Sequence, residues 1–129
     1  MTAFSFPHSR HTGLNLKDLA AVPALRVLAS GRRTGPCLLS TESGRQIFVT
    51  GHPEYDLFTL DAEYRRDLEK GLEISVPENY YPSDDPAQRP INRWRSHAHL
   101  LYHNWLNYYV YQTTPYDLEE LSPLAGEPR

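Results

Sequence analysis

Short apolar runs separated by polar turns dominate the first half of the chain. The runs are rich in valine, isoleucine and leucine, and the turns between them, Gly31–Gly35 and Glu42–Gly44, begin or end at glycine. Runs of this length bounded by turn residues are typical of β-strands. We expect three strands, in an antiparallel meander or at the edge of a mixed sheet. They cover residues 25–29, 37–40 and 46–50.

A helical pattern follows between Thr59 and Gly71. The hydroxyl of Thr59 is expected to cap the helix, and Gly71 is expected to end it. Leu60, Tyr64 and Leu68 recur every fourth residue and predict one apolar face. A shorter helix over Leu14–Ala21 is expected to precede the strands and to end before Pro23.

The longest helical pattern covers Arg93 to Gln112. Four prolines between Ile74 and Asn92 predict that the segment before it is a loop, and residues 115–129 are expected to form a loosely held tail. The broad apolar surface of the helix expected over Arg93 to Gln112 needs a surface to pack against, and three short strands provide little of one. The apolar residues of this pattern are Trp94, Ala98, Leu101, Trp105 and Tyr108, widened by Leu106, Tyr109 and Val110.

Composition places the chain among ordinary globular proteins. It has 129 residues, of which 40% are hydrophobic and 22% charged, with a net charge of −3. A general nucleic-acid surface would need an excess of basic residues, and no apolar run is long enough for a membrane span. The first residues have no basic start or apolar core, so we expect no signal peptide. The single Cys37 fits a reducing compartment, and we expect a cytoplasmic protein.

The segment after the third expected strand carries the clearest candidate chemistry. Gly51 ends the strand and His52, Pro53 and Glu54 follow it. Proline favours an extended conformation in the residue before it, and residues two apart in an extended segment point the same way. We therefore expect Glu54 to fix the tautomer of His52, whose second ring nitrogen would accept a proton. The alternative is a histidine at a strand end beside a solvated glutamate.

Several longer motifs occur in a fixed order between Phe6 and Leu118. They are Pro7–Arg10, Val49–Asp56, Tyr64–Asp67, Asn79–Pro82 with Asp84–Pro86, Trp94–His97, and Asn104–Gln112 with Thr114–Leu118. Through these motifs the chain resembles the homoserine O-acyltransferases of methionine biosynthesis, of the homoserine O-succinyltransferase type. The resemblance implies an α/β fold in which residues 1–118 would be the C-terminal part of a class I glutamine amidotransferase-like (flavodoxin-like) domain, with short strands and two main helices. Residues 119–129 would be a tail.

The resemblance also implies a reaction. In this family a Cys-His-Glu triad transfers an acyl group from coenzyme A to the γ-hydroxyl of homoserine. His52 would be the base and Glu54 its partner, and Arg66 and Ser9 would contact homoserine. The resemblance implies succinyl-CoA or acetyl-CoA as co-substrate, no other cofactor, and a homodimeric complete enzyme.

The nucleophile that the resemblance implies has no match in this chain. In the family the cysteine, the oxyanion-hole residues and a substrate-binding lysine precede the motif matched by Pro7–Arg10. Cys37 lies within an apolar strand, without the turn-to-helix junction that would expose a thiol, so we expect it to be structural. The chain would then need a missing N-terminal catalytic half. A truncated, non-catalytic remnant that binds a substrate or partner, and a related amidotransferase-like hydrolase, are the alternatives.

Two further patterns invite other functions. His99 and His103 are four residues apart, but a metalloprotease motif also needs a glutamate between the histidines and a third ligand, so we expect a solvated stripe and no metal site. The aromatic segment 105–111 lacks interleaved lysine and arginine. It is therefore expected to pack against the core or a second subunit and not to stack on nucleic-acid bases.

Overall fold

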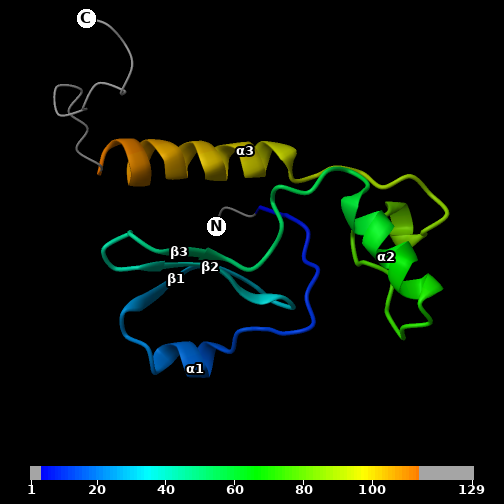
Figure 1. Cartoon of the computed structure of the whole chain (residues 1–129), viewed down its shortest axis with the longest axis horizontal. Coiled ribbons are helices and arrows are strands. Elements are labelled where there is room, and N and C mark those ends of the chain that lie inside the picture. The colour runs from blue at the N-terminus through cyan, green and yellow to red at the C-terminus, as the bar shows by residue number, and fades with distance from the viewer. Residues whose placement is uncertain (1–3, 114–129) are drawn as a thin grey trace, which may run out of the picture.

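The structure is a computed structural model that describes residues 4–113, and its centre is a three-stranded antiparallel sheet. The strands are β1 (Leu25–Gly31), β2 (Gly35–Thr41) and β3 (Ile47–Val49), in the order β1-β2-β3. Tight turns join them, and Gly44 adopts a left-handed φ of 71° that other residues rarely adopt. The meander predicted from the apolar runs is confirmed (Figure 1).

Helices lie along both sides of this sheet. In Figure 1, α1 (Leu16–Ala20) lies on one side, and the long helix α3 (Arg95–Asn104) runs along the other. The side chains of β2 point in turn to the α1 side and to the α3 side of the sheet, because successive residues of a strand face opposite ways. Leu39, 1% exposed, borders a cavity shared with Leu19 of α1, and its neighbour Leu38 lines the groove beneath α3.

The predicted middle helix is α2 (Thr59–Glu69), and two details of that prediction are wrong. Phe58 occupies the N-cap position and no side chain caps the helix, so the expected Thr59 cap is absent. Instead the backbone N–H of Asp61 donates to the hydroxyl of Tyr80, 3.2 Å away. Leu68 is 46% exposed, so the expected apolar stripe is buried only at its start, where Leu60 is 8% exposed.

Aromatic side chains form the core beside α2. The cluster joins that helix to the loop around the 3₁₀ turn η1 (Pro82–Asp84) and to the start of α3. The Tyr81 hydroxyl donates to Asp61, and the Trp94 indole N–H donates to the backbone carbonyl of Tyr55. The buried members are Leu60, Tyr80, Tyr81, Trp94 and Ala98.

The last helix changes its hydrogen-bonding pattern after Asn104. It continues as η2 (Trp105–Tyr111), a π-helix, which the sequence pattern does not predict. Its apolar residues remain largely exposed; Trp105 is 42% and Tyr108 54% exposed. None of the described helices is long and apolar enough to cross a bilayer.

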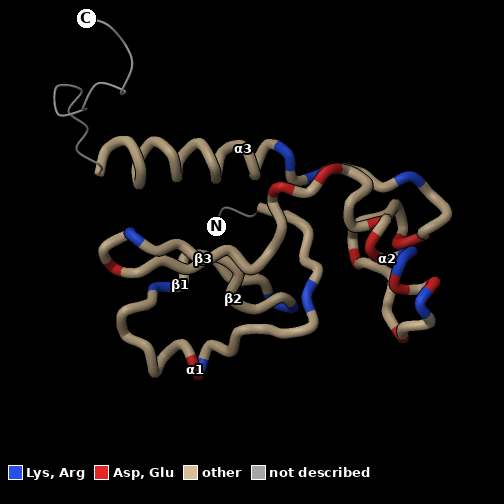
Figure 2. Tube along the Cα trace, in the orientation of Figure 1, with Lys and Arg blue, Asp and Glu red and all other residues tan. Residues whose placement is uncertain are grey.

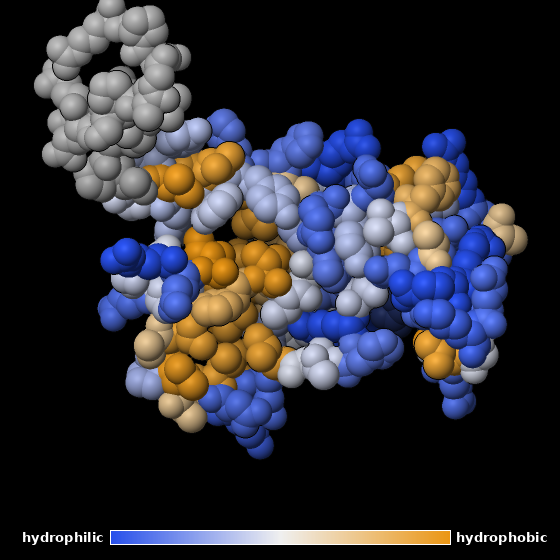
Figure 3. All heavy atoms as spheres, in the orientation of Figure 1, coloured by the Kyte–Doolittle hydropathy of each residue, from blue (hydrophilic) through white to orange (hydrophobic). Residues whose placement is uncertain are grey.

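Charge and apolar surface separate between the two ends of the molecule. Figure 2 shows acidic and basic residues gathered around α2 and the loop after it, with few along α3. Apolar side chains gather instead over the sheet beside α3 (Figure 3). Here a groove of about 520 Å³ runs between β2–β3 and the α3–η2 helix, and Phe48, Val49, Leu101 and Trp105 are among its lining residues.

Candidate functional site

The candidate site is built on the loop that leaves β3. Gly51 is buried, and the N-terminal segment packs directly against it. A Cβ at this position would lie 2.3 Å from a ring carbon of Phe6 and 2.9 Å from the carbonyl oxygen of Pro7. The His52 N–H donates to that same carbonyl at 2.7 Å. Glycine therefore allows the Pro7–Arg10 motif to lie against the His52 loop.

His52 and Glu54 face each other, but in a turn and not in the expected extended segment: the Tyr55 N–H donates to the His52 carbonyl at 3.3 Å. The Nδ1 atom of His52 lies 2.8 Å from Oε1 of Glu54. Because a carboxylate only accepts hydrogen bonds, Nδ1 carries the hydrogen and Nε2 is the nitrogen able to take a proton. The His52 side chain is 34% exposed, so a substrate or another part of a larger protein can reach it.

Tyr55 connects this pair to the rest of the candidate site, although the sequence reasoning gave it no role. Its ring stacks on the His52 imidazole, with centroids 4.3 Å apart and planes 16° from parallel. Its hydroxyl donates to Oε1 of Glu63 at 2.8 Å. Burial and the Glu63 carboxylate raise the pKa of Tyr55 to about 12. The available sequence signal was that Tyr55 directly follows Glu54.

Arg66 lies on the exposed flank of α2. Its Nε donates to Oδ1 of Asp67 at 2.8 Å, and its side chain is 54% exposed. The bond to Asp67 raises the pKa of Arg66, and the charge of Glu63 and the nearby Tyr55 act in the same direction. Among the described residues, no hydrogen bond joins Arg66 or Ser9 to the His52–Glu54 pair.

A second histidine lies beside the first. Burial, the charge of Arg10 and the charge of His52 all lower the pKa of His8. Its Nδ1 atom is buried and has no hydrogen-bond partner among the described residues. The same is true of the second carboxylate oxygen of Glu63. Unpaired buried polar atoms are uncommon.

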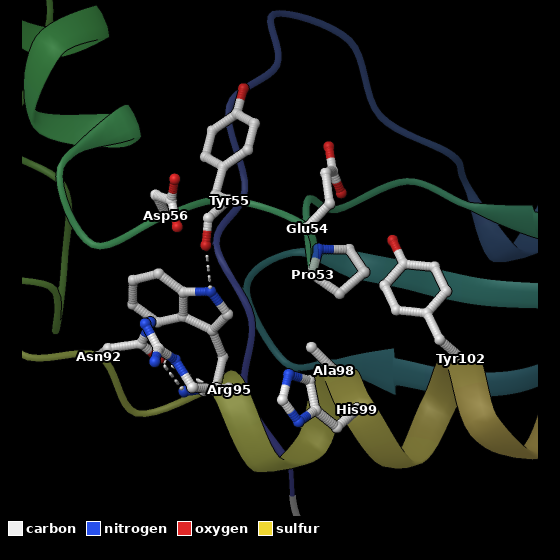
Figure 4. Close-up of a pocket in the computed structure, with 10 residues that line it drawn as sticks. Pro53, Glu54, Tyr55, Asp56, Asn92, Arg95, Ala98, His99 and Tyr102 are labelled. Atoms are coloured by element: carbon white, nitrogen blue, oxygen red, sulfur yellow. Dashed lines mark hydrogen bonds between the residues drawn. The ribbon is translucent and has the colours of Figure 1, made fainter.

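On the α3 side of the loop there is a pocket of about 440 Å³. Figure 4 shows Glu54 and Asp56 of the loop lining it opposite Arg95, His99 and Tyr102 of α3. Burial and then the Glu54 carboxylate raise the pKa of Tyr102.

Of the remaining sequence candidates, Cys37 and His103 take no part in this site, and His99 only lines the pocket beside α3. Cys37 is buried in β2, its Sγ lies 3.5 Å from the Ala29 carbonyl oxygen, and burial raises the pKa of its thiol, which disfavours the reactive thiolate. His99 and His103 are exposed on α3. Over residues 4–113, no three His, Cys, Asp or Glu side chains are grouped closely enough to hold a metal ion.

Comparison with known proteins shows the family of the chain. A sequence model described as homoserine O-succinyltransferase matches residues 1–116. Homoserine O-acetyltransferases are similar over nearly the whole chain: that of Geobacillus kaustophilus is 58% identical over 116 residues, and that of Petrotoga mobilis is 52% identical over 118. These matches cover 90% and 92% of this chain but 38% of each relative.

These findings identify the chain as a relative of enzymes that are named for acyl transfer to homoserine. The chain belongs to the homoserine O-succinyltransferase family. It spans a little over a third of the length of the relatives it matches.

Proposed function

We propose that this chain provides the general base and part of the acceptor-binding region of a homoserine O-acyltransferase. The observation that carries the proposal is the 2.8 Å contact between His52 Nδ1 and Glu54 Oε1, which leaves Nε2 as the proton acceptor. The family match supplies the reaction class, because the similar proteins are named for acyl transfer to homoserine.

The proposed reaction has two transfers. A cysteine thiolate outside this chain attacks the carbonyl carbon of the acyl-CoA thioester, and the coenzyme A thiolate leaves. The γ-hydroxyl of homoserine then attacks the resulting acyl-enzyme while His52 Nε2 takes the hydroxyl proton. The cysteine sulfur departs, and the O-acyl ester is formed. Glu54 holds the imidazole and stabilises the imidazolium that results.

Ser9 and Arg66 are proposed to contact homoserine. A guanidinium suits the carboxylate of an amino acid because its N–H groups can bind both oxygens. In the structure Asp67 engages Nε of Arg66. This contact leaves the two terminal nitrogens of the guanidinium for such a pair.

We further propose that residues 1–118 form the C-terminal part of a class I glutamine amidotransferase-like domain, as the resemblance implies. The apolar groove between β2–β3 and α3–η2 is the surface on which the rest of that domain would pack. Support comes from the apolar side chains exposed there, since burying them is favourable, and from the 38% coverage of the relatives. A cytoplasmic homodimer acting in methionine biosynthesis completes the proposal.

A chimera tests the proposed function. The 116 matched residues of this chain replace the matched segment of the Geobacillus kaustophilus relative. We expect the purified chimera to release coenzyme A in a homoserine-dependent reaction, with acetyl-CoA and succinyl-CoA each tried as donor. The chain alone is expected to release none, and Cys37→Ser should leave the chimera active. A folded but inactive chimera would support the non-catalytic alternative.

A further inference from the structure

Tyr55 is held more firmly than a side chain that merely fills space beside the histidine. At one end its backbone carbonyl accepts the indole N–H of Trp94 at 3.0 Å, and Trp94 is 4% exposed. At the other end its hydroxyl donates to Glu63 at 2.8 Å. Figure 4 shows the hydroxyl end pointing away from the Trp94 contact, so the two anchors act at opposite ends of the residue.

His52 needs a second constraint of this kind. A single hydrogen bond to Glu54 fixes the position of Nδ1, but the imidazole can still rock about that bond. The Tyr55 ring covers one face of the imidazole at 4.3 Å and nearly parallel, which restricts that motion. An electron-rich ring over the face also favours the imidazolium form that proton transfer creates.

We propose that Tyr55 is a positioning residue with two functions: its ring sets the plane of the His52 imidazole, and its hydroxyl holds the Glu63 carboxylate of α2. The kinetic consequences of this inference rest on the proposed function. The His52–Tyr55 contact can be measured whether or not the proposed function is correct. The hydroxyl and the ring are separable, because Tyr55→Phe removes only the first and Tyr55→Leu removes both.

The first test uses NMR on the 129-residue chain. Tyr55→Leu should shift the His52 ring protons downfield, because the ring current above them is lost, and should lower the order parameter of the His52 ring. Tyr55→Phe should leave both near the wild-type values. Tyr64→Leu is the matched control: Tyr64 is also partly buried, but the ring it contacts is Tyr81. Unchanged His52 signals in Tyr55→Leu would overturn the inference.

The second test uses the chimera and separates kcat from the homoserine KM. Tyr55→Phe should raise KM with little change in kcat, because Glu63, one helical turn before the proposed homoserine contact Arg66, loses its hydroxyl partner. Tyr55→Leu should in addition lower kcat by about 3- to 10-fold, the range expected for losing an aromatic stacking contact. A kcat for Tyr55→Leu equal to that of Tyr55→Phe would refute the positioning role. An inactive wild-type chimera would refute the proposed function, while the NMR result would still decide the contact.

Discussion

Replacing Gly51 by alanine should separate the N-terminal motif from the His52 loop. The new Cβ would lie 2.3 Å and 2.5 Å from two ring carbons of Phe6 and 2.9 Å from the carbonyl oxygen of Pro7. The ring could rotate away, but the Pro7 carbonyl belongs to the backbone and accepts the His52 N–H at 2.7 Å. Relief of the overlap therefore requires the segment to move, and overpacking of this kind costs about 1–3 kcal/mol.

Amide hydrogen exchange measures this effect at the bond concerned. If the cost falls on the docking of the N-terminal segment, the His52 amide should exchange about 5- to 150-fold faster in Gly51→Ala, after correction for intrinsic rates. Gly13→Ala is the matched control, because a Cβ at Gly13 has no neighbouring atom within 4 Å among the described residues. A His52 amide protected equally in both variants would refute the reasoning.

Four further predictions concern the chimera and the chain. In the chimera, Glu54→Gln should lower kcat by on the order of a hundredfold, because the imidazolium loses its carboxylate partner. Arg66→Lys should mainly raise the homoserine KM, because a bidentate contact becomes a point charge. An unchanged KM would remove Arg66 from the acceptor site. The 129-residue chain should bind a hydrophobic dye at the exposed groove, and a cooperatively unfolding monomer without dye binding would show that the groove needs no covering partner. The hydrogen bond from Arg65, together with one from Tyr81, lowers the pKa of Asp61 in the folded state. The contribution of Asp61 to the stability of the chimera is therefore present above the unfolded pKa of about 4 and is lost as the pH falls through the lower folded pKa. Urea unfolding of Asp61→Asn and wild-type chimera should therefore differ near pH 7 and converge in acid; a difference independent of pH would contradict this.

Local patterns predicted much of the fold because the forces concerned are local. Apolar runs between glycine turns located all three strands, whereas His52 and Glu54 meet through a turn at Pro53 and not through the expected extended segment. The expected Thr59 cap is absent, and a residue distant in sequence, Tyr80, accepts the hydrogen bond of the Asp61 N–H in the first turn of α2 instead. Long-range partners of this kind leave no signal in the spacing of nearby residues.

The rest of the candidate site depended on tertiary contacts in the same way. Tyr55 lies in the loop after β3 and Glu63 lies in α2, and only the fold brings the Tyr55 hydroxyl to the Glu63 carboxylate. The exposed apolar side of α3 and η2 was expected to need a surface to pack on, and the described residues leave much of it uncovered. The expected tail, residues 115–129, and the segment Thr114–Leu118 of the last family motif lie outside the described residues.

The central claim is that His52 is the base that activates homoserine. Its most direct test is the rate of homoserine-dependent coenzyme A release by the chimera carrying His52→Ala, compared with the chimera carrying His103→Ala on exposed α3. We expect the first variant to lose at least a hundredfold in kcat, within the range for a general base, and the second to match the unmodified chimera. A His52→Ala chimera that folds and turns over homoserine at the unmodified rate would contradict the account.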